Sequence, residues 1–461
     1  MASNPTSMTL DEVDPGWAWA PYVPGAEQPW SRSLAAHLYR RAGFAASSAQ
    51  LDEAVRCGPS EAVRLLLPGG AESETFRQEI DTLVQTILAT GDSRHLAAVW
   101  VYRLLNTPEQ LLEKTTLFWH GHFATSAEKV QDAELMLDQN KLFRRHALGD
   151  FAQLVHEMAR DPAMLIYLDS ATNRKAHPNE NFARELLELF CLGEGNYTET
   201  DVQELARCFT GWEVQRGSYR FNRYQHDTGE KSILGQTGSF GGDEGVRVVL
   251  DQEAMPRYIV GKLIRYFVFD EPEPPPRLVE PLVIAFREGG LQIRPVVERI
   301  LNSRLFFSMH AIGRKVRSPI ELAIGLLRVV EGTANAVLLA AELTQLGHGL
   351  FYPPSVKGWD GGRAWINSST LLGRANLVRK LLEDENTRFS DGSLGTFLVS
   401  HGIQQPEELV DWLQTLLIAI PLSGAVRQRL LQVYEDTTGD TSAKAAALIH
   451  AASTLPECQI A

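Results

Sequence analysis

Apolar residues recur at helical spacing almost without a break from Ser33 to the end of the chain, and this pattern constrains the fold most. Helix-start signals accompany it, such as the capping box and first-turn proline of Ser318-Pro319-Ile320-Glu321. Strand-like alternation is scarce, and its best examples are residues 218–221 and 247–250. The sequence therefore predicts an all-α protein: a large helical domain with irregular glycine- and proline-rich loops and at most a small β-hairpin, near residues 213–250.

Caps and breakers place several of these helices. A glycine, a proline or a capping side chain marks where each one begins or ends. We expect one helix that ends at Gly43, two within 48–67 that are separated at Gly58-Pro59, one over 96–105, one that starts at Thr107-Pro108, and a long one from Ser126 to about Leu148.

Composition divides the chain into three segments. Residues 1–32 hold five prolines and three tryptophans, which favour an arm held on the protein surface by its indoles over a helix. Residues 33–380 form the predicted main helical domain. Residues 381–461 are again helical in pattern, with polar interruptions, and we expect a C-terminal helical subdomain or tail.

Charge and composition exclude some classes of function. The chain has 57 acidic and 44 basic residues, and its net charge of −13 disfavours non-specific binding to nucleic acid. No run of eighteen apolar residues occurs, so we expect no membrane span. The four cysteines are scattered and form no CxxC, which argues against a disulfide framework or a zinc ribbon. The N-terminus lacks the basic and apolar regions of a signal peptide, so we expect a cytoplasmic protein.

The first candidate for chemistry is the His120-Gly121-His122 stretch, at the expected end of the helix that begins near Pro108. Two histidines at i and i+2 face apart on a regular helix, but a relaxed helix end allows both rings to bind one metal. In the alternative interpretation, each histidine is a buried polar residue that bonds a backbone carbonyl.

A second candidate is the amphipathic helix predicted over Glu180–Leu192, with Phe182, Leu186 and Leu189 on its buried face. Its polar face carries Glu185 and Glu188 one turn apart, which supply hard oxygen ligands or a general base. The alternative is a solvated face on which Glu180, Arg184 and Glu188 form ion pairs at i,i+4.

Two further stretches lie in predicted loops. His226-Asp227 offers a metal ligand or an acid–base group, or else an Asx turn closed at Gly229. The loop 347–366 is rich in glycine and proline and carries Lys357, Trp359 and Trp365, which suits either the lining of a site or a packed connection. No phosphate-binding loop and no Gly-x-Ser-x-Gly elbow occurs anywhere in the chain.

Read in order, these tracts resemble a bacterial family catalogued as domain of unknown function 1800, over roughly residues 33–375. The resemblance implies no reaction or cofactor, but it does imply a partner. Genes of this family often adjoin one for a phosphatase- or sulfatase-like family, domain of unknown function 1501. Cys191 stands where the family pattern has threonine. The resembling pieces are 39–44, FWHGHFATS (118–126), Gln139-Asn140, DPAML (161–165), 167–169, PNENFARELLELF (178–190), YTETDV (197–202), FTGW (209–212), His226-Asp227, KSILG (231–235) and PPSVKGW (353–359).

Two hypotheses about function follow. In the first, the chain is a metal-dependent enzyme of unknown substrate, with oxidation favoured over hydrolysis. Its divalent metal (iron, manganese or zinc) is bound by His120, His122, Glu185, Glu188 and His226, and its catalytic residues are Glu185, His226 and Asp227. In the second, the chain is a non-catalytic helical scaffold or a maturation partner of a phosphatase- or sulfatase-like protein. Arginines such as Arg184 and Arg207 then neutralise the same carboxylates.

Overall fold

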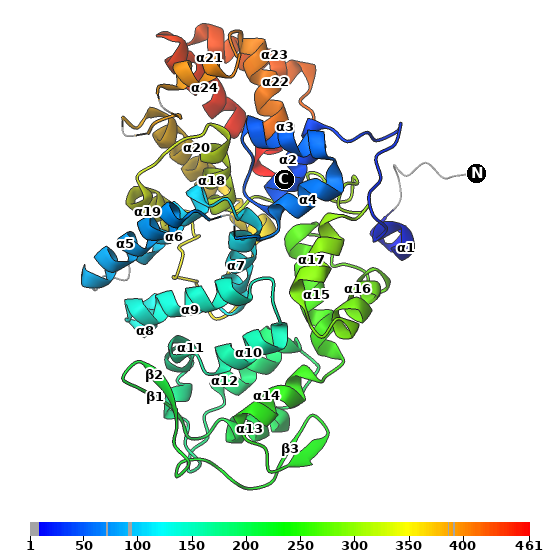
Figure 1. Cartoon of the computed structure of the whole chain (residues 1–461), viewed down its shortest axis with the longest axis vertical. Helices are drawn as coiled ribbons and strands as arrows, with labels where there is room; N and C mark the ends of the chain where they lie inside the picture. The colour runs from blue at the N-terminus through cyan, green and yellow to red at the C-terminus, as the bar shows by residue number, and fades with distance from the viewer. Residues whose placement is uncertain (1–8, 71, 91–94, 386, 391) are drawn as a thin grey trace.

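Helices account for most of the described chain, as the periodicity predicts (Figure 1). The structure is a computed structural model, and it describes residues 9–70, 72–90, 95–385, 387–390 and 392–461. The helices up to residue 208 are η2 (Leu10–Glu12), α1 (Pro15–Ala18), α2 (Arg32–Ala42), α3 (Ser48–Cys57), α4 (Pro59–Leu66), α5 (Glu74–Thr90), α6 (Leu96–Asn106), α7 (Gln110–His122), α8 (Ala127–Val130), α9 (Ala133–His146), α10 (Phe151–Ala159), α11 (Pro162–Tyr167), η4 (Ser170–Thr172), α12 (Asn181–Glu185), the π-helix η5 (Leu186–Cys191) and α13 (Glu199–Cys208).

The second half of the chain adds a further series of helices. They are α14 (Gly242–Leu250), α15 (Ala254–Phe267), α16 (Pro276–Glu288), α17 (Ile293–Leu301), α18 (Pro319–Val329), α19 (Ala336–Gln345), η6 (Gly362–Trp365), α20 (Ser368–Glu383), α21 (Leu394–Ser400), α22 (Pro406–Leu416), α23 (Gly424–Asp436), α24 (Thr441–Ser453) and α25 (Pro456–Gln459). None of the described helices is both long and apolar enough to cross a membrane.

Two short antiparallel hairpins interrupt the helices. Strand β1 (Trp212–Gln215) pairs with β2 (Ser218–Phe221), and β3 (Lys231–Ile233) pairs with β4 (Gln236–Gly238). The first hairpin lies where the alternation of residues 218–221 predicts a strand. The strand predicted over 247–250 is wrong, because these residues end helix α14. Val246, Val249 and Leu250 lie at i, i+3 and i+4, so the helix buries all three on one face.

The long helix predicted from Ser126 to Leu148 is also divided. Ser126 caps only the short helix α8, and the chain then passes through Gln131 in a left-handed conformation (φ 53°). Asp132 caps the next helix, α9, by accepting hydrogen bonds from two backbone amides. A second capping side chain within the apolar pattern therefore ends one helix and starts another.

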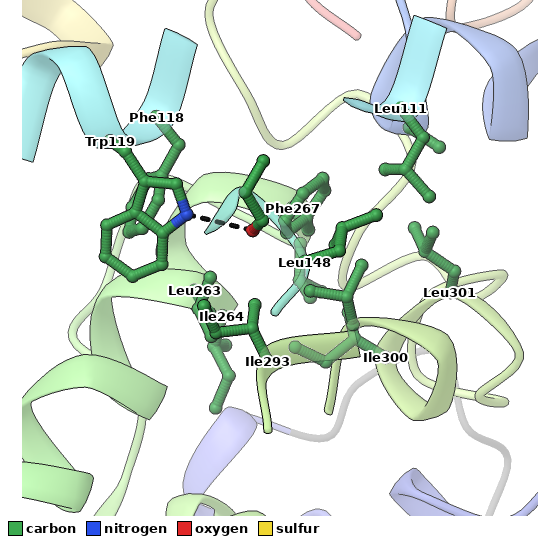
Figure 2. Close-up of a cluster of buried hydrophobic side chains, with 14 of the residues drawn as sticks. Leu111, Phe118, Trp119, Leu148, Leu263, Ile264, Phe267, Ile293, Ile300 and Leu301 are labelled. Atoms are coloured by element: carbon green, nitrogen blue, oxygen red, sulfur yellow. Dashed lines mark hydrogen bonds between the residues drawn. The ribbon is translucent and has the colours of Figure 1, made fainter. Parts of the chain in front are cut away.

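A hydrophobic cluster packs α7 against α15 and α17 (Figure 2), which lie near the middle of the molecule in Figure 1. The Trp119 indole is fully buried, and its Nε1 donates a hydrogen bond of 2.9 Å to the carbonyl of Ala147. The cluster shown in Figure 2 includes Leu111 and Phe118 of α7, Leu263, Ile264 and Phe267 of α15, and Ile293, Ile300 and Leu301 of α17.

Two tryptophans of the N-terminal segment are hydrogen-bonded to helices elsewhere in the chain. Trp19 Nε1 donates to the Leu278 carbonyl at 2.7 Å, and Trp30 Nε1 donates to the Ala54 carbonyl at 2.9 Å. At the other predicted boundary, helix α20 runs continuously across residue 380. The division into three segments stays a prediction.

Candidate functional site

A cavity of about 460 Å³ opens beside the C-terminal half of α7. Helix α15 forms a second wall with Lys262, Arg265 and Tyr266, and residues 315–321 form a third. The loop 347–366 covers it with Lys357, Trp359 and Trp365. The cavity is therefore built from segments far apart in the sequence, around the helix that carries His122.

Lys262 differs from Arg265, the other cation of this wall, in that its bonded partners are uncharged. Its Nζ donates to Nδ1 of His122 at 3.1 Å and to the carbonyl of Leu189 at 3.3 Å, and it lies 4.7 Å from the centroid of the Tyr258 ring. Among the described residues, no carboxylate lies within ion-pair distance of it. Burial, with the nearby positive charge of Arg265, lowers the pKa of Lys262 to about 8.

The bonding of His122 fixes its tautomer. Its Nε2 lies 2.9 Å from the carbonyl oxygen of Phe190. Because a carbonyl only accepts, Nε2 carries the proton and Nδ1 offers its lone pair to Lys262. Burial, reinforced by the charge of Lys262, holds the pKa of His122 well below its usual value, so the ring is neutral. The pair is thus an ammonium group supported by a neutral acceptor.

A π-helix supplies the carbonyl groups that hold this pair. The helix predicted over Glu180–Leu192 begins as α12 and continues directly into η5. At the end of η5, the amide of Leu192 donates to the carbonyl of Leu187, five residues earlier, as in a π-helix. The carbonyl of Leu189 accepts from the Tyr258 hydroxyl and from Lys262, while the carbonyl of Phe190 accepts from His122. Such π-helical turns are frequent at functional sites.

The predicted burial of this helix is confirmed in part. Phe182 and Leu186 are buried, with 2% and 1% of their surfaces exposed. Leu189 is only partly buried. The wider π-helical turn changes the direction of the residues that follow Leu186, so a pattern drawn at 3.6 residues per turn no longer describes them.

Three of the four acidic residues that line the cavity have cationic partners. Asp270 pairs with Lys315 at 2.7 Å and accepts from the amide of Val316, while Glu271 pairs with Arg363. Glu321 pairs with Lys114, which lies behind the wall. Burial alone would raise the pKa of Glu321, but the ammonium groups of Lys114 and Lys315 hold it well below its usual value. Asp360 is exposed at the rim.

Two lysines therefore remain unpaired at the cavity. Like Lys262, the exposed Lys357 has no carboxylate within ion-pair distance among the described residues. Arg265, the remaining cation of the wall, pairs with Glu273 at 2.6 Å. The cavity thus offers one ammonium group in its wall and another at its rim. Such an arrangement attracts small anions.

The loop 347–366 packs closely on the end of α7. Gly358 has a φ of +74°, and a Cβ at this position would lie 2.2 Å from the carbonyl oxygen of Gly121. This approach brings the Trp359 ring within 5.5 Å of the His120 ring and within 5.0 Å of the His348 ring, measured between centroids. Burial lowers the pKa of both histidines to about 3, so both rings are neutral. The aromatic wall of the cavity is thus uncharged.

The two histidines predicted to share a metal have separate environments. His120 Nε2 accepts from the amide of Phe351 at 3.1 Å, whereas both ring nitrogens of His122 are engaged by Phe190 and Lys262. Both histidines lie within the regular helix α7, without the relaxed end that would aim them together.

The predicted carboxylate ligands also have other surroundings. Glu188 accepts from the Tyr197 hydroxyl at 2.7 Å. Burial, with the charge of Glu188, raises the pKa of Glu185, while Arg184 and Lys357 act in the opposite direction. Over the described part of the chain, no three His, Cys, Asp or Glu residues are grouped so as to hold a metal ion. The residues present do not fit the predicted centre.

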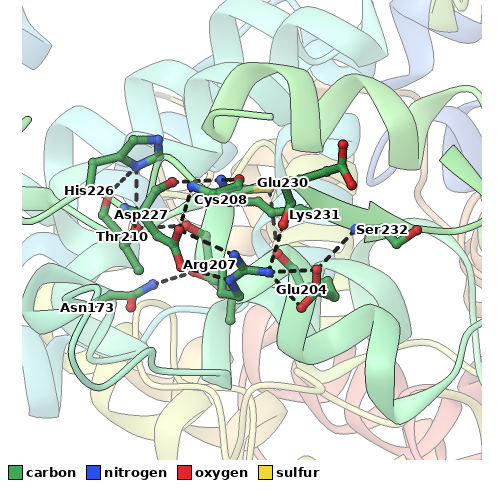
Figure 3. A network of polar contacts seen from close by, with 12 residues as sticks. Asn173, Glu204, Arg207, Cys208, Thr210, His226, Asp227, Glu230, Lys231 and Ser232 are labelled. Atoms are coloured by element: carbon green, nitrogen blue, oxygen red, sulfur yellow. Dashed lines mark hydrogen bonds and ion pairs between the residues drawn. The ribbon is translucent and has the colours of Figure 1, made fainter. Parts of the chain in front are cut away.

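His226 and Asp227 belong to a different network, near the two hairpins at the lower end of Figure 1 (Figure 3). His226 Nδ1 lies 2.9 Å from the carbonyl of Thr210, and Arg207 donates to both carboxylate oxygens of Asp227. The hydrogen bonds from Arg207, and that from Gly229, lower the pKa of Asp227 to about 2. The Asx turn that the sequence offered as the alternative is present, since the Gly229 amide donates to Asp227.

Sequence reasoning singled out Lys357, Trp359 and His122 but missed Lys262. A signal for Lys262 exists, because Tyr258, Lys262 and Tyr266 lie at i, i+4 and i+8 and so form one stripe along α15. A lysine between two tyrosines at the border of an apolar face indicates a partly buried amine. Its partners on the π-helix leave no such mark.

These features define an α-helical protein with a lysine- and tryptophan-lined cavity. A family model described as a protein of unknown function, DUF1800, matches residues 37–460. The chain belongs to this family, and the resemblance read from its motifs is confirmed. Neither the curated proteins nor the solved structures contain a match to the chain.

Proposed function

We propose that the cavity binds a small organic anion and that Lys262 is the reactive group that acts on it. The observation that carries this proposal is the environment of the Lys262 ammonium, which faces the cavity and has only neutral partners among the described residues. A cation held in this way is expensive without an anion nearby. Perturbed ionisable groups in cavities are characteristic of functional sites.

The chemistry of the wall supports a carboxylate as the anion. Lys357 at the rim provides a second unpaired ammonium, and Trp359 and Trp365 provide apolar surface for the body of the ligand. With a pKa of about 8, Lys262 exchanges a proton near neutral pH, which suits acid–base chemistry. His122 positions the amine through the hydrogen bond to its Nδ1.

Thermal unfolding at constant ionic strength tests this proposal, with acetate, lactate, succinate, citrate and phosphate as probes. At least one probe should raise the unfolding temperature in a saturable way, because a ligand at 100 times its Kd stabilises the folded state by about 2.7 kcal/mol. Lys262→Met should abolish this effect and Lys357→Met should weaken it. Lys141→Met is the matched control, since this lysine is exposed on α9 and pairs with Asp138. Stabilisation that survives in both cavity variants would overturn the proposal.

One observation favours the scaffold hypothesis for the other polar residues. Arg207 pairs with Asp227, so this proposed catalytic acid is neutralised without a metal. The acids that pair with Arg184, Glu180 and Glu199, are not among the proposed metal ligands. The metal-dependent reaction, the oxidoreductase class and the cytoplasmic location stay predictions from the sequence. Elemental analysis of the purified protein tests the metal.

A physical partnership with a protein of the domain of unknown function 1501 family also stays a proposal. Its test is co-purification of the two chains after co-expression. A complex that persists through gel filtration supports the partnership, and separate elution of two folded chains contradicts it.

A further inference from the structure

We infer that Lys262 forms an imine with a 2-oxo acid or another small acid that carries a carbonyl group. This inference rests on the proposed function and names its reaction and its substrate class. It starts from the position of Nζ, which belongs to a residue that lines the cavity and carries no carboxylate partner. A primary amine in this setting is available to a bound carbonyl carbon.

The neighbours of Lys262 fit each part of such a substrate. The unpaired ammonium of Lys357 suits the carboxylate of the acid, and the aromatic wall at Trp359 suits its apolar carbon atoms. Arg265 lies close enough for its charge to favour the neutral amine of Lys262, which is the nucleophilic form. The cavity of about 460 Å³ has room for a molecule of this size.

The reaction balances without an oxidant or a further reactant. The Nζ lone pair forms a bond to the carbonyl carbon, and the carbonyl π electrons pass to oxygen. One proton moves from nitrogen to that oxygen, with Nδ1 of His122, the hydrogen-bond acceptor of Nζ, as the relay. The remaining proton on nitrogen then passes to the hydroxyl, the C–O bond breaks as water leaves, and the nitrogen lone pair forms the C=N bond. The products are the imine and one molecule of water.

Reductive trapping tests the inference. The full-length chain is incubated with pyruvate or glyoxylate, treated briefly with sodium borohydride, and examined by intact mass spectrometry and peptide mapping. We expect one stable adduct per chain at Lys262, and its loss in Lys262→Met. Lys141→Met should keep the adduct, and excess lactate, which lacks the carbonyl group, should suppress it by competition.

The lactate arm separates the two proposals. If lactate and pyruvate both stabilise the protein through Lys262 but no adduct forms at this residue, the imine is wrong and the anion site stands. If no adduct forms and neither these two acids nor any of the other probes stabilises the protein, both proposals are overturned. Adducts spread evenly over exposed lysines such as Lys141 would also refute a specific imine. Circular dichroism of Lys262→Met shows whether the variant is folded.

Discussion

Replacement of Lys262 by methionine should stabilise the protein in the absence of a ligand. Lowering the pKa of this ammonium from 10.5 to about 8 costs the folded state about 3 kcal/mol at neutral pH. The side chain is partly exposed in the cavity, so solvent screening reduces the cost to about 1–2 kcal/mol. Methionine has a similar length and no charge, and it keeps the contact with the Tyr258 ring.

The main loss in this variant is the donor to Nδ1 of His122. Because His122 also lines the cavity, water can replace that donor. We therefore expect a net gain of about 1 kcal/mol. The gain has a defined pH dependence. Between pH 8 and 10.5 the unfolded wild-type chain binds more protons at Lys262 than the folded one, so wild-type stability rises with pH there. The advantage of the variant is thus complete below pH 8 and vanishes by about pH 10.5.

Urea unfolding followed by tryptophan fluorescence measures this difference as a shift of the midpoint at unchanged slope. Lys315→Met is the matched control in the same cavity, with the opposite expected sign. Its side chain and that of Asp270 are 12% and 13% exposed, and removing it leaves Asp270 without its cation, at a cost of about 1–3 kcal/mol. If Lys262→Met lost more than about 1 kcal/mol, Lys262 would be a structural residue and the reasoning would fail.

Three further predictions concern positions outside the cavity. The Leu186→Asp variant should lose several kcal/mol of unfolding free energy, measured by chemical denaturation, because it buries an unpaired charge. Leu186→Met should lose less than about 1.5 kcal/mol. Equal stability of the two variants would contradict the packing. Burial raises the pKa of Asp161 to about 7, so the free energy of unfolding of the wild type falls as the pH rises from 4 to 7. The stability of Asp161→Asn, measured relative to the wild type, should therefore be greater at pH 8 than at pH 4. Arg207 holds the pKa of Asp227 at about 2, so the charged Asp227 stabilises the wild type above pH 4, and this stabilisation is lost as the pH falls to 2. Asp227→Asn should lack it at every pH. Identical acid unfolding curves of the two proteins would refute this.

Local signals predicted most helices, because each cap acts on the backbone next to it. The capping box at Ser318 starts α18, as the sequence indicates, and Asp161 caps α11 before Pro162. The errors arise where two local signals compete. Three valines near residue 248 favour a strand by propensity, but helix α14 buries Val246 and Val249 on one face together with Leu250. Asp132 offers a cap within an apolar pattern that otherwise predicts one long helix.

The candidate site was predicted only in part, for a different physical reason. The glycines, prolines and tryptophans of the loop 347–366 indicated a candidate site lining, and the spacing of His122 from His120 indicated a candidate ligand. The partners of His122 lie 68 and 140 positions away in the chain, on η5 and α15. Two of the bonds at the site end on main-chain carbonyls, which every residue has, so no side-chain pattern reveals them.

The π-helix links these distant segments. Backbone carbonyls in the last turn of any helix lack partners within it. In η5, two such carbonyls point toward α7 and α15, where Leu189 holds Lys262 and Phe190 fixes the tautomer of His122. Over the described residues, the bonded partners of Nζ are one carbonyl oxygen and a neutral imidazole, so the amine is positioned without a carboxylate that would stabilise its charged form. A glutamate in their place would raise the pKa of Lys262 and suppress its reactivity, so the use of main-chain acceptors is itself an argument for a reactive lysine.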